Sequence, residues 1–318
     1  MKKMFLIGCL LLLGGAPFQA WAEGQRFAYV VSDLRIPFWQ IMWHGVQEQA
    51  RIQDDEVFVL SAENSAKKEL ENMVQAIRER VDGIVLSPMN SSSAVTLLKL
   101  AEKAGIPVVI SDIGTQGGQF VSYIESDNEA GAYQLGQILT DELQQRQLLG
   151  SVGIIAVPQD RQNGKLRTQG FLLALSEAGI PSAYIHQQSD FSYEETRHFS
   201  QALIRDYPDL SAIWLQGSDQ YRAALDSIRE AGKEGEILLV CFDAEPEFIE
   251  LIQKGVLAGA AMQQPFLMGA RSVSSLDLYL AGGAVPRVQQ LDVLAVSKAN
   301  IDSLLPAIRR NVLGLTAD

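Results

Sequence analysis

Short β-rich runs alternate with amphipathic helical stretches along this chain, with about one pair for every 25–30 residues. The run Phe27–Val31 is typical of a buried strand, because it holds aromatic and β-branched residues. Leu70, Met73 and Ile77 are spaced as on one face of a helix. Strands that are apolar on both faces and separated by helices form parallel sheets with helices on both sides. The chain is therefore predicted to be an α/β protein.

The number of these units predicts two lobes. Strands are expected at 27–31, 57–60, 83–86, 107–110, 152–157, 183–185, 212–215 and 237–242, and helices beginning near 37, 94, 129, 164, 193 and 218. The alternation restarts after Ser126-Asp127-Asn128, and about ten units are more than one doubly wound sheet ordinarily holds. We expect two Rossmann-like lobes with parallel sheets. Short crossovers should join them, since no Pro/Gly-rich linker separates the two halves.

The first 22 residues have the pattern of a secretory signal peptide. Lys2 and Lys3 precede the apolar run Met4–Leu13, and Ala20-Trp21-Ala22 is a small-residue exit site. The run is too short for a membrane-spanning helix. A competing interpretation is a lipidated Cys9, but four leucines continue the apolar run beyond it. We expect cleavage after Ala22 and a soluble protein in the periplasm.

Composition and missing motifs exclude several classes of function. The formal charge of −12 argues against nucleic acid and anionic membranes as partners. Once Cys9 leaves with the leader, Cys241 is the only cysteine, and its apolar neighbours predict a small buried side chain. His44, His186 and His198 lack metal-ligand spacing, and no nucleophile or dinucleotide motif occurs. The sequence therefore predicts no enzyme activity, no cofactor and no metal.

Polar residues follow the predicted strands, including Asp33, Ser87, Asp112, Asp243 and Gln263. Helix capping explains any one of them, because Ser and Asp are favoured caps. Open parallel sheets, however, bind ligands outside the carboxyl ends of their strands. The gathering of polar residues at one edge therefore favours a ligand site.

At these strand ends the chain resembles the type I periplasmic binding proteins, the ribose-binding group most closely, over residues 25–305. The resemblance is carried by Pro37-Phe38-Trp39, by Asp82–Pro88, by Ser126–Gly131, by Arg167–Phe171 and by Met262–Pro265. LacI-type repressors share this core but begin with a DNA-binding helix-turn-helix. A leader stands at that place here.

The resemblance implies two lobes that close on a small ligand by hinge bending. Crossovers are expected near 126–127, 263–264 and 290–291, so one lobe holds 23–126 plus 265–290 and the other 127–264 plus 291–318. The implied function is a monomeric periplasmic binding protein that delivers a sugar or sugar-like compound other than ribose to an ABC importer. The alternative is a receptor that presents its ligand to a sensor kinase or chemoreceptor.

The resemblance also assigns ligand-binding positions. It places Phe38, Trp39 and Phe191 as aromatic walls, and Asp112, Asp243 and Gln263 as hydroxyl-binding groups. Lys165 stands where ribose binders carry Arg, and Ser87 and Gly217 where they carry Asn. Ile36 and Ile113 replace an Asn and an Arg. With Asp33 from the strand-end rule, the predicted ligand-binding residues are Asp33, Phe38, Trp39, Ser87, Asp112, Lys165, Phe191, Asp243 and Gln263.

Overall fold

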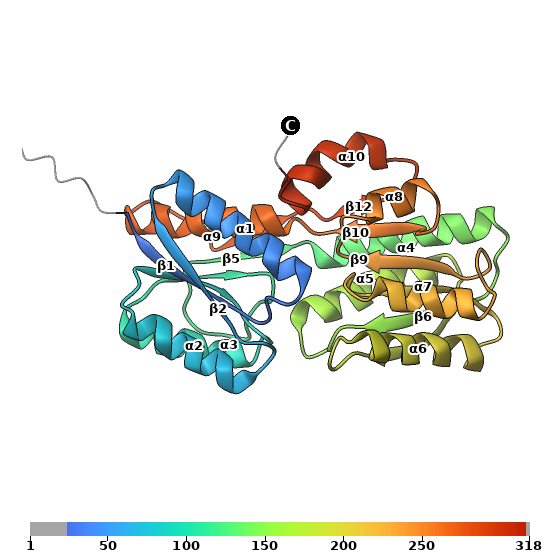
Figure 1. The fold of residues 1–318 in the computed structure, drawn as a ribbon, viewed down its shortest axis with the longest axis horizontal. Coiled ribbons are helices and arrows are strands. Elements are labelled where there is room, and N and C mark those ends of the chain that lie inside the picture. The colour runs from blue at the N-terminus through green and yellow to red at the C-terminus, as the bar shows by residue number, and fades with distance from the viewer. Residues whose placement is uncertain (1–23, 316–318) are drawn as a thin grey trace, which may run out of the picture.

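The computed structural model describes residues 24–315, which form two lobes side by side (Figure 1). The predicted leader 1–22, with its cleavage site and Cys9, lies outside the described residues. Within 24–315, no helix is both long and apolar enough to cross a bilayer.

The first lobe is built on a six-stranded sheet in the order β11-β5-β4-β3-β1-β2, in which every neighbouring pair is parallel. Its strands are β1 (Arg26–Val31), β2 (Glu56–Ser61), β3 (Gly83–Ser87), β4 (Val108–Ser111), β5 (Ser122–Ser126) and β11 (Val288–Leu291). Four helices accompany it: α1 (Pro37–Ile52), α2 (Ala66–Arg78), α3 (Ser93–Ala104) and α9 (Pro265–Leu280). Helices α1 and α9 pack together on one face, and α2 and α3 lie on the other (Figure 1).

The second lobe repeats this topology in the order β12-β10-β9-β8-β6-β7. Its strands are β6 (Ser151–Ala156), β7 (Ser182–Gln187), β8 (Leu210–Leu215), β9 (Leu238–Phe242), β10 (Gly259–Met262) and β12 (Leu294–Val296), and only β12 is antiparallel to its neighbour. Its helices are α4 (Asn128–Gln145), α5 (Gln162–Glu177), α6 (Tyr193–Asp206), α7 (Tyr221–Glu230), α8 (Phe248–Gln253) and α10 (Ile301–Ala307), followed by the π-helical turn η1 (Ile308–Val312).

Three crossovers join the lobes. They follow β5 at Asp127, β10 at Gln263-Gln264 and β11 at Asp292-Val293. The third lies slightly later than expected, because Leu291 still pairs with Ser126 in the first sheet. The two-lobed α/β fold with three crossovers is therefore confirmed.

Local chemistry explains where several helices begin. Pro37 occupies the first turn of α1, where a missing N–H leaves no bond unmade. The side chains of Ser65, Asp127 and Ser192 each accept a backbone N–H at the start of α2, α4 and α6. Helix α7 begins at Tyr221, three residues later than expected at 218.

The predicted strands are present, and Cys241 is fully buried in β9, as its apolar neighbours indicated. Strands β5, β11 and β12 were not predicted, and β10 was indicated only by the polar residue Gln263 that follows it. The β11 segment Val-Gln-Gln-Leu is too polar and β12 is too short to be distinguished from loop by composition.

Candidate functional site

A small cavity lies between the lobes, at the carboxyl ends of both sheets. Its volume is about 50 Å³, and residues from both lobes form its wall. The lining residues are Ile36, Phe38, Trp39, Asp112, Val157, Arg161, Asn163, Arg167, Phe191, Gly217, Asp219, Asp243 and Gln263. The position agrees with the rule that parallel sheets bind ligands beyond the carboxyl ends of their strands.

Aromatic rings form two walls of this cavity. Phe38 and Trp39 project from the first turn of α1, directly after Pro37, and their rings meet edge to face with centroids 4.8 Å apart. Phe191 comes from the second lobe, and the Arg161 guanidinium lies 5.3 Å from its ring centroid. Such π-faces suit the C–H faces of a flat polyol ring.

Two aspartates occupy equivalent positions in the two lobes. Asp112 follows β4 and Asp243 follows β9, the third strand from the same edge of each sheet. Both have left-handed backbones, with φ of 67° and 69°. Each donates its N–H to the next strand, Asp112 to Ile124 at 2.9 Å and Asp243 to Ala261 at 2.8 Å. Backbone strain of this kind in non-glycine residues is concentrated at functional sites.

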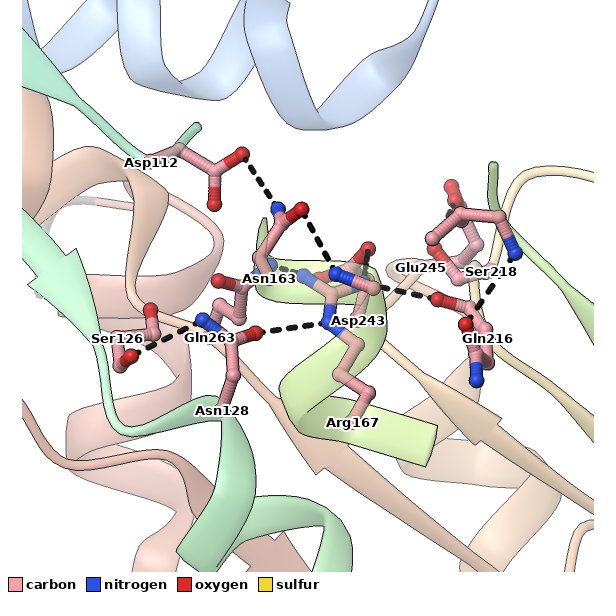
Figure 2. Close-up of polar contacts among 12 residues, drawn as sticks. Asp112, Ser126, Asn128, Asn163, Arg167, Gln216, Ser218, Asp243, Glu245 and Gln263 are labelled. Atoms are coloured by element: carbon pink, nitrogen blue, oxygen red, sulfur yellow. Dashed lines mark hydrogen bonds and ion pairs between the residues drawn. The ribbon is translucent and has the colours of Figure 1, made fainter. Parts of the chain in front are cut away.

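Arg167 organises the polar wall of the second lobe (Figure 2). This 3% exposed side chain donates from Nε to Asn128 Oδ1 at 2.7 Å and from Nη1 to the carbonyl of Gln216 at 2.9 Å. It also lies 3.7 Å from Asp243 Oδ2. Gln263 Nε2 donates to Asp243 Oδ1 at 2.5 Å. Arg167, Asp243 and Gln263 therefore form one connected network.

Two buried acceptors facing the cavity have no hydrogen-bond partner among the described residues: Asp112 Oδ1 and Gln263 Oε1. Their residues are 3% and 1% exposed. An unpaired buried acceptor costs about 1–3 kcal/mol, so both atoms are suited to donors from a ligand.

Burial shapes the ionisation of the acids. It raises the pKa of Asp112 to about 6, with the Asp243 carboxylate adding to the rise and Arg167 and Arg161 opposing it. Burial also raises the pKa of Asp243, against the opposing effects of Arg167 and Gln263. The pKa of Asp219 is also raised to about 6, and burial is again the largest cause. Removal from water therefore makes the charged form of each of these carboxyl groups less favourable.

Contacts between the lobes cluster at the start of α5. Asn163 Nδ2 donates to Asp112 Oδ2 at 3.2 Å, and Arg161 Nε donates to the carbonyl of Met89 at 3.0 Å. The loop that carries Met89 is itself fixed, because Met89 N–H and Ser93 Oγ donate to the buried Glu69 carboxylate at 2.6 and 3.1 Å. The second lobe thus contacts a loop of the first lobe that hydrogen bonds to Glu69 hold in place.

Six of the nine predicted ligand-binding residues line the cavity: Phe38, Trp39, Asp112, Phe191, Asp243 and Gln263. The other three do not. Asp33 is paired with Arg35 at 2.6 Å and faces a separate cavity of about 420 Å³ at the mouth of the cleft. Ser87 is fully buried and shares a hydrogen bond of 3.2 Å with Tyr29. Lys165 lies exposed on the outer face of α5.

Four charged or polar cavity residues were missed: Arg161, Asn163, Arg167 and Asp219. Helix periodicity contained a signal for two of them. Arg167 and Asn163 precede the buried Phe171 by one and about two helical turns, so all three share one face of α5, whereas Lys165 falls on the opposite side. The loop residue Asp219 carried no such periodic signal.

Two parallel-sheet lobes that share three crossovers and enclose a polar cavity have the architecture of the type I periplasmic binding proteins. The periplasmic binding protein domain family matches residues 27–284. The chain therefore belongs to this family.

Its relatives cover nearly the whole chain. The ribose import binding protein of Haemophilus influenzae is 27% identical over 299 residues, 94% of this chain and 100% of that protein. The D-allose-binding periplasmic protein of Escherichia coli is 22% identical over 286 residues, 87% and 90% of the two chains. An ABC-transporter solute-binding protein from Actinobacillus succinogenes, solved with bound D-allose, matches with a TM-score of 0.81 at 22% identity over 88% of this chain and 99% of that chain.

Proposed function

We propose that this protein binds a small sugar or sugar-like polyol in the cleft and delivers it to an ABC importer. The observation that carries the proposal is the pairing of aromatic walls, Phe38, Trp39 and Phe191, with two unpartnered acceptors, Asp112 Oδ1 and Gln263 Oε1. Aromatic faces bind the C–H side of a sugar ring and the acceptors bind its hydroxyls. Solute-binding proteins among the relatives support a binding role over an enzymatic one.

The ligand is proposed to differ from ribose. Ile36 presents an apolar edge to the cavity, and Ile113, 1% exposed, packs in the core of the first lobe. Neither can donate a hydrogen bond from its side chain. A ligand with fewer hydroxyls along this edge is therefore favoured.

Delivery for import is favoured over presentation to a sensor kinase or chemoreceptor, because relatives are named for import. We propose that the protein works as a monomer in the periplasm, after removal of residues 1–22. N-terminal sequencing of the exported protein should then begin at Glu23. Acylated protein beginning at Cys9 would contradict this processing.

A thermal-shift and calorimetric panel of pentoses, hexoses and polyols tests the function. A ligand at 100 times its dissociation constant should stabilise the protein by about 2.7 kcal/mol. The Asp243→Asn variant should lose most of this shift, whereas Asp206→Asn, a surface change in the same lobe, should keep it. The proposal fails if no compound of the panel binds the wild type.

A further inference from the structure

The loop between β8 and α7 brings a third carboxylate to the cavity. Asp219 lines it beside Gly217, and a Cβ at Gly217 would lie 3.4 Å from Asp219 Oδ1. This distance is ordinary van der Waals contact, so the carboxylate lies directly beside position 217. The backbone at Gly217 does not need glycine, because its φ is not positive.

Asp219 upsets the charge balance of the cavity. Three carboxylates, Asp112, Asp219 and Asp243, face two guanidiniums, Arg161 and Arg167. Arg167 pairs with Asp243. Arg161 stacks on Phe191 and donates to Met89.

No ion pair within residues 24–315 involves Asp219. It accepts one side-chain hydrogen bond, from its neutral neighbour Gln220, at 3.3 Å. The neighbouring Ser218 Oγ donates to the Glu245 carboxyl group at 2.9 Å, and burial raises the pKa of Glu245 to about 7, so it supplies no positive charge to Asp219 and only a partial negative one. The second lobe therefore holds an uncompensated negative charge beside the cavity.

Two other atoms of the cavity also lack a hydrogen-bond donor. Asp112 Oδ1 and Gln263 Oε1 are buried acceptors without partners. An ammonium group supplies three donors and no acceptor, and its charge would balance the excess carboxylate. A hydroxyl supplies one donor and no charge.

We propose that Asp219 is a specificity-determining residue that selects a polyol carrying an ammonium group, such as an amino sugar. This inference rests on the proposed function, and it narrows the ligand class. Burial raises the pKa of Asp219 to about 6, so its carboxylate is ionised at neutral pH, when a sugar amine is largely charged.

Calorimetry with matched sugar pairs tests the inference. The probes are D-glucosamine, D-galactosamine, 3-amino-3-deoxy-D-glucose and 6-amino-6-deoxy-D-glucose, each compared with its neutral hexose. The wild type should bind at least one amino sugar about ten- to a hundred-fold more tightly than its neutral partner, as expected for a charge-assisted bond. Asp219→Asn, which keeps the size of the side chain, should remove this preference.

Two further variants separate selectivity from folding and from net charge. Gly217→Asn should place an amide against the Asp219 carboxylate and so weaken the preference for the amino sugar. Asp206→Asn removes one negative charge on the surface of the same lobe and should leave the preference intact. Circular dichroism confirms that each variant is folded.

The outcomes distinguish the two proposals. Binding of neutral sugars alone, or an unchanged preference in Asp219→Asn, overturns this inference and leaves the proposed function standing. Failure of every sugar to bind the wild type overturns both.

Discussion

The two lobes place an aspartate at the same point of the same topology, yet the two carboxylates have different surroundings. Asp243 lies 3.7 Å from Arg167 and accepts from Gln263 at 2.5 Å, so its partners come from the second lobe and a crossover. The Asp112 carboxylate accepts one hydrogen bond, and this comes across the cleft from Asn163. The second lobe therefore holds an assembled polar site, whereas the Asp112 carboxylate of the first lobe depends on closure of the cleft for its partner.

This difference suggests an order of events. The network of Arg167, Asp243 and Gln263 needs no contribution from the first lobe, so a ligand can bind there while the cleft is open. We propose that closure then brings Asp112, Trp39 and Phe38 to the ligand, since Asn163 of the second lobe already contacts Asp112 across the cleft. Hinge closure of this kind couples binding to a change of shape.

Removing the cation of the assembled site should have the largest effect. Arg167→Met should lower the free energy of unfolding by about 3–5 kcal/mol, because it leaves the buried Asp243 carboxylate unpaired. Urea denaturation measures the loss. The double variant Arg167→Met/Asp243→Leu should regain much of the stability without regaining binding. A stable single variant would show that the second lobe is not organised by this charge.

The two aspartates should respond differently to the same substitution. Both Asp112→Asn and Asp243→Asn should weaken ligand binding by about 2–4 kcal/mol, since each removes a charge-assisted acceptor. Asp112→Asn should stabilise the protein at neutral pH by about 1–3 kcal/mol, because burial raises the pKa of Asp112 from 3.8 to about 6. Asp243→Asn should stabilise it less, because it also removes the ion pair with Arg167, which opposes the rise in the pKa of Asp243. Equal stability changes in urea would remove the asymmetry between the lobes.

The pH dependence sharpens the same contrast. Because its folded pKa is raised, the Asp112 carboxyl contributes stability that is complete below about pH 4 and lost as pH rises through about 6. The wild type should therefore lose stability relative to Asp112→Asn at about 1.4 kcal/mol per pH unit across this window, then level off. Ligand affinity should change in the opposite sense and fall below about pH 6, because a protonated Asp112 accepts fewer hydrogen bonds. A flat difference between pH 4 and 7 would contradict the assigned burial.

Weakening the contact across the cleft should have a moderate effect. Arg161→Ala removes the hydrogen bond to the Met89 carbonyl and the stacking on Phe191, so affinity should fall about tenfold through a less stable closed form. Stopped-flow measurements should assign the change to faster release. A change confined to the association rate would indicate electrostatic steering instead.

The smallest effect is expected at the outer face of α5. Lys165→Ala should change affinity less than about twofold, because exposed charges of this kind contribute little. Calorimetry on Lys165→Ala beside Arg167→Met compares two basic residues that are neighbours in sequence. Equal losses would place the cationic position at Lys165 after all.

Most of the fold could be predicted from the sequence, because buried parallel strands and the helices between them differ in composition and in hydrophobic period. It could not reveal β11, whose Gln289 and Gln290 are polar. Pairing with β5 and a hydrogen bond from Gln289 to Ser275 stabilise this segment, and both depend on the assembled lobe.

The site was predictable where one residue after a strand determines what faces the cleft, as at Asp112 and Asp243. It was less predictable where packing decides. Ser87 ends β3 as expected, but Tyr29 covers its hydroxyl. Asp219 lies in the loop after β8, where no periodic pattern predicts which side chain faces the cavity.

A crystal structure with the tightest-binding sugar of the panel tests the central claim directly. The account predicts a ring between Trp39 and Phe191, with ligand donors on Asp112 Oδ1 and Gln263 Oε1, the two buried acceptors that have no partner within residues 24–315. A sugar bound outside the cleft, or one that leaves both acceptors unpaired, would contradict it.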